Sequence, residues 1–126
     1  MRVGFVLAAL TLLTLPAAAA DAPKVLTVLT VKVKGDPAAY LQKIKQFSAV
    51  QKRLETGGTV RVWQATAAGA SVGMIYVAVE YANLEAFAKG STKLQADEEW
   101  TKLRKELAAS GMREVVDSSL MVEVTP

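Results

Sequence analysis

The segment TVRVWQATAAGASVGMIYVAVEY, residues 59–81, decides the fold of this chain. Residues 59–66 and 72–81 alternate apolar and polar side chains with a period of two, which is typical of strands with one buried face. Between them, residues 68–71 (AGAS) are expected to form a hairpin loop of about four residues. The parity of the apolar side chains predicts a register that pairs Trp63 with Tyr76 and Arg61 with Ala78.

A strand and a helix are predicted before this hairpin. Residues 25–33 are rich in β-branched side chains and read as an extended strand. Asp36 is suited to cap a helix and Pro37 suits its first position, after which Tyr40, Leu41, Ile44, Phe47 and Leu54 recur at helical spacing. Gly57 and Gly58 are expected to end this helix.

A broken helix and a last strand are predicted after the hairpin. Asn83 can cap a helix that carries Leu84, Phe87, Ala88 and Leu94. A break is expected near Ala96, after which Asp97 caps a continuation with Trp100, Leu103 and Leu107 on one face. Gly111 is expected to end it, and residues 114–124 read as a fourth strand.

The resulting order, βαββαβ, predicts an α+β domain of the ferredoxin-like type, with a four-stranded antiparallel sheet and its helices on one face. Residues 21–126 are expected to form one such domain. The main rival is a different α+β topology built from the same elements.

Parity also predicts which side chains face the helices. These are Ile75, Val77 and Val79 with Val60 and Val62, joined by Val25, Leu29, Val31 and Val33 and by Val116, Leu120, Val122 and Val124. The other surface, the open face, carries Leu26, Val28, Thr30, Lys32, Arg61, Trp63, Met74, Tyr76, Ala78, Glu80, Asp117, Ser119, Met121 and Glu123.

The open face is too apolar to remain in water, so a cover is expected. The simplest cover is a second copy of the chain, packed sheet to sheet. Candidate residues for this dimer face or for a ligand pocket are Lys32, Arg61, Trp63, Met74, Tyr76, Glu80, Asp117 and Met121. Glu80 lies diagonal to Arg61 in the predicted register, so an ion pair is expected there, with a buried proton-transferring acid as the alternative.

The hairpin and the following segment NLEAFAKGSTKLQADEEWTKL, residues 83–103, resemble the dimeric α/β-barrel superfamily, in particular NIPSNAP-like and antibiotic-biosynthesis-monooxygenase-like members. Asn83, Phe87 and Trp100 match its pattern, and each is assigned a packing or capping role. The resemblance implies a homodimer of ferredoxin-like subunits whose opposed sheets enclose a cavity. Two functional classes stay open. The favoured one is a non-catalytic exported homodimer whose barrel interior is either filled by side chains or binds a small apolar or aromatic molecule. The other is a cofactor-independent monooxygenase-like or isomerase-like enzyme whose pocket is lined by Arg61, Trp63, Tyr76 and Glu80.

The residue types present restrict the chemistry further. The chain contains neither histidine nor cysteine, so the commonest general base, the thiol nucleophile and the usual transition-metal ligands are missing. Asp97, Glu98 and Glu99 open a helix and are interpreted as a cap, not as a metal site. Ser118 and Ser119 lack a histidine partner, which disfavours a hydrolase. No cofactor or metal is expected, and whether the protein is an enzyme stays open.

The N-terminal segment predicts export. Arg2 precedes an apolar run from Val3 to Leu15, and residues 15–20 (LPAAAA) supply a helix break and the small residues of a signal-peptidase site. Residues 1–20 are therefore expected to be a cleaved signal peptide, with a retained membrane anchor as the alternative, and the domain is expected to be periplasmic or secreted. The full chain has 15 basic and 12 acidic side chains, and removal of the signal peptide takes away Arg2. The charges of the domain are thus nearly balanced and interleaved, so neither nucleic acid nor membrane is an expected partner.

Overall fold

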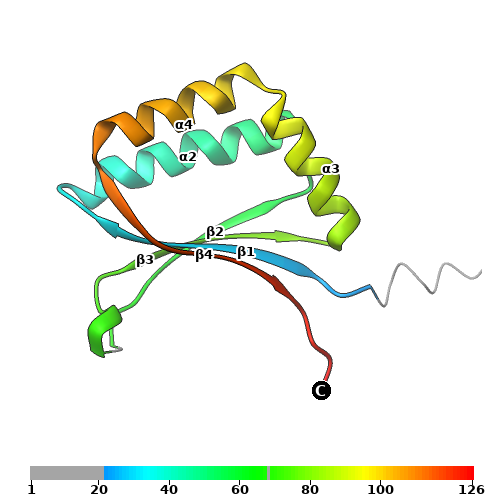
Figure 1. Cartoon of the computed structure of the whole chain (residues 1–126), viewed down its shortest axis with the longest axis horizontal. Coiled ribbons are helices and arrows are strands. Elements are labelled where there is room, and N and C mark those ends of the chain that lie inside the picture. Colours follow the sequence, from blue (N-terminus) through cyan, green and yellow to red (C-terminus); the bar gives the residue numbers. More distant parts are fainter. Residues whose placement is uncertain (1–21, 68) are drawn as a thin grey trace, which may run out of the picture.

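The computed structural model describes residues 22–67 and 69–126, and the predicted signal peptide lies outside them. Four antiparallel strands form one sheet in the order β2-β3-β1-β4, and the helices lie together on one side of it (Figure 1). The elements are β1 (Val25–Val33), α2 (Pro37–Arg53), β2 (Thr59–Gln64), β3 (Ile75–Tyr81), α3 (Leu84–Gln95), α4 (Glu98–Ser110) and β4 (Arg113–Val122). This is the ferredoxin-like arrangement predicted from the sequence. Among the described residues, no helix is both long and apolar enough to cross a membrane.

The hairpin has the predicted register but a longer loop. Trp63 pairs with Tyr76 and Arg61 with Ala78. Regular pairing extends to a hydrogen bond from the Ala65 N–H to the Met74 carbonyl, 3.0 Å long, so the turn is longer than the expected residues 68–71. A short 3₁₀ turn occupies Gly69–Ser71, and Gly73 has a φ of +88°, which a strand does not accommodate.

Helices α2, α3 and α4 begin at the predicted caps. The side chains of Asp36, Asn83 and Asp97 accept hydrogen bonds from the backbone N–H groups of Ala38, Ala86 and Trp100. The break near Ala96 is confirmed, and Gly111 ends α4 in the left-handed conformation at φ 65°. One boundary was wrong: α2 ends at Arg53, before Gly57, because Leu54 forms its C-cap and Glu55 takes a φ of 52°.

A bulge in β4 corrects the predicted side-chain facing at that edge. Thr30 pairs with Asp117, but the next residue, Val31, pairs with Val115, so Val116 is an extra residue without a partner. From this point towards the start of the strand the parity is inverted. Val115 and Arg113 therefore replace Val116 on the side of the helices, while Leu120 and Val122 keep their predicted side.

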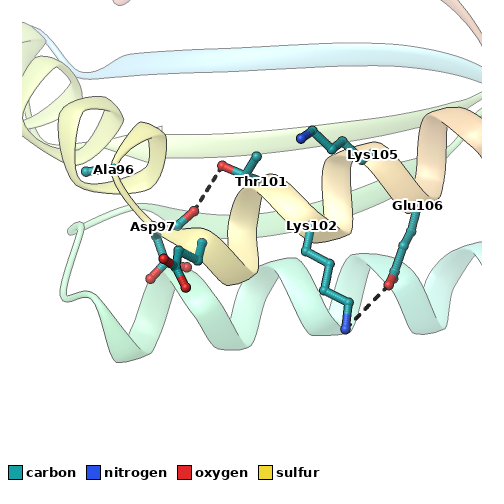
Figure 2. Close-up of a pocket in the computed structure, with 7 residues that line it drawn as sticks. Ala96, Asp97, Thr101, Lys102, Lys105 and Glu106 are labelled. Carbon is teal, nitrogen blue, oxygen red and sulfur yellow. Dashed lines mark hydrogen bonds and ion pairs between the residues drawn. The ribbon is translucent and has the colours of Figure 1, made fainter.

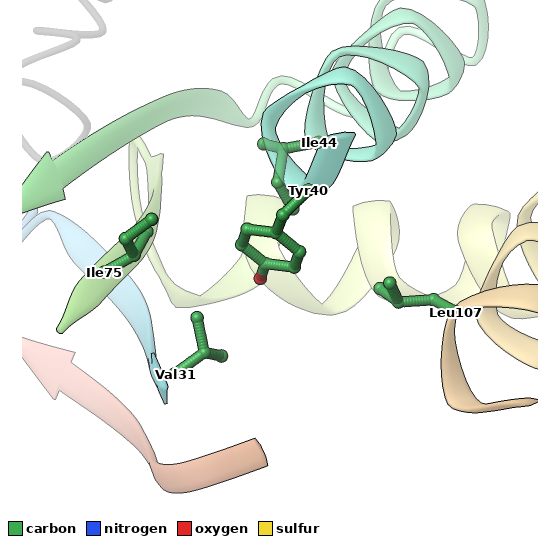
Figure 3. Packing of buried hydrophobic residues seen from close by; sticks show 5 residues of the cluster. All are labelled: Val31, Tyr40, Ile44, Ile75 and Leu107. Carbon is green, nitrogen blue, oxygen red and sulfur yellow. The ribbon is translucent and has the colours of Figure 1, made fainter. Parts of the chain in front are cut away.

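The core lies between the sheet and the helices. Tyr40 and Ile44 from α2 and Leu107 from α4 pack against Val31 and Ile75 of the two central strands (Figure 3). A second buried cluster joins the three helices through Val50, Leu94 and Leu103, with Phe47, Leu54 and Trp100 packed against it. The apolar stripes of the helices thus pack against the apolar face of the strands and form one layer.

Candidate functional site

The open face gathers residues from all four strands into rows across the sheet. The paired positions give three such rows, which are Thr59-Glu80-Leu26-Met121, Arg61-Ala78-Val28-Ser119 and Trp63-Tyr76-Thr30-Asp117. Lys32 and Glu114 extend the face beyond the bulge. The structure therefore places the predicted candidate residues of β1, β2, β3 and β4 on one surface, with Met74 hydrogen-bonded next to β2 at the same end.

The middle of this face is apolar and its edges carry the charges. Ala78 and Thr30 in the central strands are buried by their neighbours, whereas Trp63 on one edge strand is 61% exposed and Met121 on the other is 48% exposed. Arg61, Lys32 and Asp117 are exposed around them. An exposed tryptophan and methionine around an apolar centre are typical of a surface that a partner covers.

The expected ion pair between Arg61 and Glu80 is absent, which corrects that prediction. Glu80 Oε1 lies 3.2 Å from the Lys24 amino group instead. Lys24 precedes Val25, whose partner is Tyr81, so its side chain reaches Glu80 from the other diagonal of the sheet. Both side chains of this pair are partly exposed, so the contact has the character of a surface ion pair.

Two further polar groups of the open face contact each other. The Ser119 hydroxyl donates a 2.7 Å hydrogen bond to the Asp117 carboxylate, which uses that hydroxyl locally. Within residues 22–67 and 69–126, no group of three or more acidic side chains is placed to hold a metal ion.

A cavity of about 300 Å³ lies on the opposite side of the sheet, beneath the helices. Its floor is formed by β1, β2 and β3, and its roof by α2 and α4. Most of the lining is apolar, and the lining residues are Thr27, Leu29, Ile44, Phe47, Gln51, Val60, Val77, Val79, Trp100, Arg104 and Arg113. Its volume lies at the lower end of the range for small-molecule sites, about 300 to 1,000 Å³.

Two aromatic rings form one wall of this cavity. Phe47 of α2 and Trp100 of α4 pack edge to face, with ring centroids 4.8 Å apart and an interplanar angle of 84°. This geometry is favourable for aromatic pairs and holds the two helices in a fixed relation. The wall therefore presents two packed aromatic rings to the cavity.

A buried polar cluster adjoins the cavity through Gln51. Gln51 Oε1 accepts hydrogen bonds from the Thr56 hydroxyl at 2.6 Å and from the Tyr81 hydroxyl at 3.4 Å. Burial raises the pKa of the Tyr81 phenol above its usual value, and the hydrogen bond to Gln51 opposes this in part. Gln51 lines the cavity from α2, and because its Oε1 already accepts two hydrogen bonds, its amide nitrogen is the atom left to contact a ligand.

Two arginines supply the charge of the cavity lining. Arg113, at the start of β4, donates a 3.1 Å hydrogen bond from Nη1 to the buried Tyr40 hydroxyl, and its Cζ lies 5.9 Å from the Tyr40 ring centroid. Arg104 lies on α4 one turn after Trp100 and is exposed. Neither guanidinium has a carboxylate within 4 Å in the described part of the chain.

The acidic run at the start of α4 acts in capping. Asp97 accepts the Trp100 N–H, and Arg53 Nη2 lies 2.9 Å from the Asp97 carboxylate and 3.0 Å from that of Glu99. The pKa of Asp97 lies below its usual value, chiefly because of the Trp100 hydrogen bond and then because of Arg53. The adjoining groove is exposed and shallow, with Thr101 bonded to Asp97 and Lys102 facing Glu106 (Figure 2).

Sequence reasoning placed the open face correctly but missed the cavity. Phe47 and Trp100 were predicted as packing residues, and packing is what they do against each other. The contribution of Arg113 depends on the bulge in β4, which no pattern in the sequence indicated. The available signal was Arg104, a charged side chain four residues after Trp100 on a helix whose apolar face was already predicted.

No protein-family model matches the sequence, and no curated protein matches it. Twenty chains of solved structures resemble this structure. A NIPSNAP family protein of unknown function from Agrobacterium tumefaciens is 18% identical, with a TM-score of 0.59 over 79% of this chain and 87% of that one. SnoaB, a cofactor-independent oxygenase from Streptomyces nogalater, is 17% identical, with a TM-score of 0.58 over 83% of this chain and 97% of its own.

A third similar structure is described as a dimeric ferredoxin-like protein from an uncultured marine organism. It is 13% identical, with a TM-score of 0.56 over 82% of this chain and 98% of that one. At these identities the likeness concerns the fold. The resemblance inferred from the hairpin and the following helix is confirmed at that level.

Proposed function

We propose, from a fold shared with NIPSNAP family proteins and SnoaB, that this protein is an exported homodimer that binds a small apolar or aromatic molecule. The observation that carries the dimer is the open face, where Trp63 and Met121 lie exposed on either side of an apolar centre. A second copy packed against this face would remove both side chains from water. A structurally similar protein is described as a dimeric ferredoxin-like protein, which supports a dimer here as well.

The oligomeric state tests the dimer directly. Sedimentation velocity of the purified protein at micromolar concentration is expected to give a dimer. A monomer under these conditions would contradict the proposal. Native mass spectrometry of protein isolated from its source adds a second reading, because it reports the oligomeric state and any retained small molecule together.

The ligand belongs, in this proposal, in the cavity beneath the helices. The sequence pointed to the space between opposed sheets, whereas the cavity lined by Phe47, Trp100 and Val77 supports a site within each protomer. Aromatic and aliphatic walls favour an apolar body, and Gln51 offers a polar contact. Ligand extracted from the native protein, or its displacement by apolar dyes, tests this location.

Export is the third part of the proposal and is supported by residues 1–20 alone. Mass analysis of the secreted or periplasmic product is expected to show a chain that begins at or near Asp21. A product that keeps Met1 would contradict cleavage and favour a retained anchor.

The second candidate function is cofactor-independent oxygenation. The likeness to SnoaB and the aromatic cavity wall favour it, because such chemistry needs an electron-rich substrate held in a dry pocket. An oxygen electrode with a panel of hydroquinones and naphthols tests it. Enzyme-dependent oxygen uptake that Trp100→Ala abolishes would support the enzyme, and uptake unchanged by this substitution would exclude the cavity as its site.

A further inference from the structure

We infer that the cavity selects a small aromatic acid, with the carboxylate held between Arg104 and Arg113. This inference rests on the proposed ligand-binding function and names its ligand class. Both arginines line the cavity together with apolar side chains and the polar pair Thr27 and Gln51. Among the described residues, the lining contains no acidic side chain that would neutralise them.

The state of the two guanidiniums supports recognition of an anion. Several charged side chains on the helices of this protein are paired, as Arg53 is with Asp97 and Lys43 with Glu106. Arg104 and Arg113 have no such partner within the part of the chain that the structure describes. An arginine remains charged throughout the physiological pH range, and its planar guanidinium matches a carboxylate. A carboxylate on the ligand would therefore pair with guanidinium groups that have no carboxylate partner in the described part of the protein.

The fixed position of Arg113 strengthens the inference. Its Nη1 donates to the Tyr40 hydroxyl, and Tyr40 is fully buried, so the guanidinium is held at one end before any ligand arrives. Preorganisation of this kind lowers the entropic cost of binding. Arg104, an exposed residue of α4, lines the same cavity and is the second guanidinium proposed to contact the carboxylate.

The apolar wall defines the rest of the ligand. Phe47 and Trp100 pack edge to face and line the cavity together with Val77 and Val79, and a cavity of about 300 Å³ accommodates a flat body of one or two rings. A highly charged or bulky polar molecule would leave those side chains against polar atoms. The cavity thus combines one site for an anionic group, formed by the two arginines, with a lining that is otherwise mostly apolar.

The test uses matched probes, 2-naphthoate and its neutral analogue 2-naphthamide, with affinities measured by calorimetry. The acid is expected to bind about tenfold or more tightly than the amide, because hydrogen bonds to charged groups outweigh neutral ones. The variant carrying both Arg104→Gln and Arg113→Gln is expected to lose this preference while its amide affinity is retained. Arg104→Gln alone, at an exposed position, is expected to lower the preference for the acid over the amide several-fold.

Two controls keep the test specific. Lys105→Gln removes the same charge from the next residue of α4, which does not line the cavity, and is expected to keep the preference. Because the chain has two tryptophans, the Trp63→Phe variant reports Trp100 alone, and its fluorescence is expected to change on binding. If Arg113→Gln fails to fold, Arg113→Lys keeps the charge and tests the fork geometry.

The outcomes separate this inference from the function it rests on. Equal affinity for acid and amide would overturn the anion selection while leaving a ligand cavity in place. Binding of neither probe would contradict both the anion selection and the proposed ligand cavity, while the dimer and export keep their own tests. A preference that survives the double variant would place the anion contact elsewhere and also contradict the inference.

Discussion

Val31 and Trp63 show how differently the two faces of one sheet are treated. On the covered face, Val31 is 0% exposed beneath Tyr40 and Leu107, whereas on the open face Trp63 is 61% exposed. Both faces are apolar at their centre, but the chain supplies helices for one only (Figure 1). The covered face provides the stability of the protomer and a cavity, and the open face is left for a partner.

The largest expected effect concerns the open face. Trp63→Asp places a charge in the proposed interface and is expected to weaken dimerisation by about 100-fold or more. Sedimentation velocity over a concentration series measures it. Leu84→Asp alters a comparably exposed side chain at the start of α3 and is expected to leave the dimer intact. Equal behaviour of the two variants would contradict the assignment of the faces.

The covered face is expected to dominate the stability of the protomer. Leu107 is 1% exposed, so Leu107→Ala is expected to lower the free energy of unfolding by about 2 to 5 kcal/mol. Leu120 lies on the same side of the sheet but half exposed on the edge strand, and Leu120→Ala is expected to cost much less. Urea unfolding compares them, and a reversed order would show that the helices do not form the main core.

A smaller effect tests the close packing at the end of the covered face. A Cβ at Gly90 of α3 would lie 2.9 Å from the Thr56 carbonyl oxygen and 3.0 Å from Tyr81 Cε1. Gly90→Ala is therefore expected to destabilise by about 1 to 3 kcal/mol, although alanine is the better helix former by about 1 kcal/mol. Thermal unfolding shows whether Gly90→Ala lowers or raises the stability, and a stabilised variant would contradict this packing.

The smallest expected effect lies at the start of α4. Because the folded-state pKa of Asp97 is lowered, its charge stabilises the fold above its unfolded pKa, about 3.9, and this contribution is lost as pH falls through the folded value. Asp97→Asn keeps a capping side chain without the charge. Wild type is expected to be more stable than this variant at pH 7, with the difference beginning to shrink near pH 4 and vanishing only below the lowered folded-state pKa. An unchanged difference at low pH would exclude the charge as its cause.

Local patterns predicted most of the fold. Parity in the hairpin gave the observed pairing of Trp63 with Tyr76, and the caps Asp36, Asn83 and Asp97 lie where side-chain chemistry required them. The turn between β2 and β3 was less predictable. Its length depends on where Gly73 turns out of the strand, and glycine permits that conformation without requiring it.

The candidate site was only partly predictable. The candidate residues of the open face lie on one side of regular strands, so the two-residue period of a strand was sufficient to predict that Arg61, Tyr76 and Met121 share that face. The partner of Glu80 depended on which of two diagonal neighbours its side chain meets, and Lys24 is that neighbour. The cavity depended on how far the helices stand from the sheet, which no periodicity records.

The sequence by itself determined the order of the elements, their caps and the two faces of the sheet, because these follow from interactions between residues near in the chain or related by a fixed period. Tertiary structure alone decided the bulge at Val116, the position of Arg113 beside Tyr40 and the space between Trp100 and Val77. The physical reason is that these features arise where separately formed elements meet, and packing between distant residues sets the geometry there.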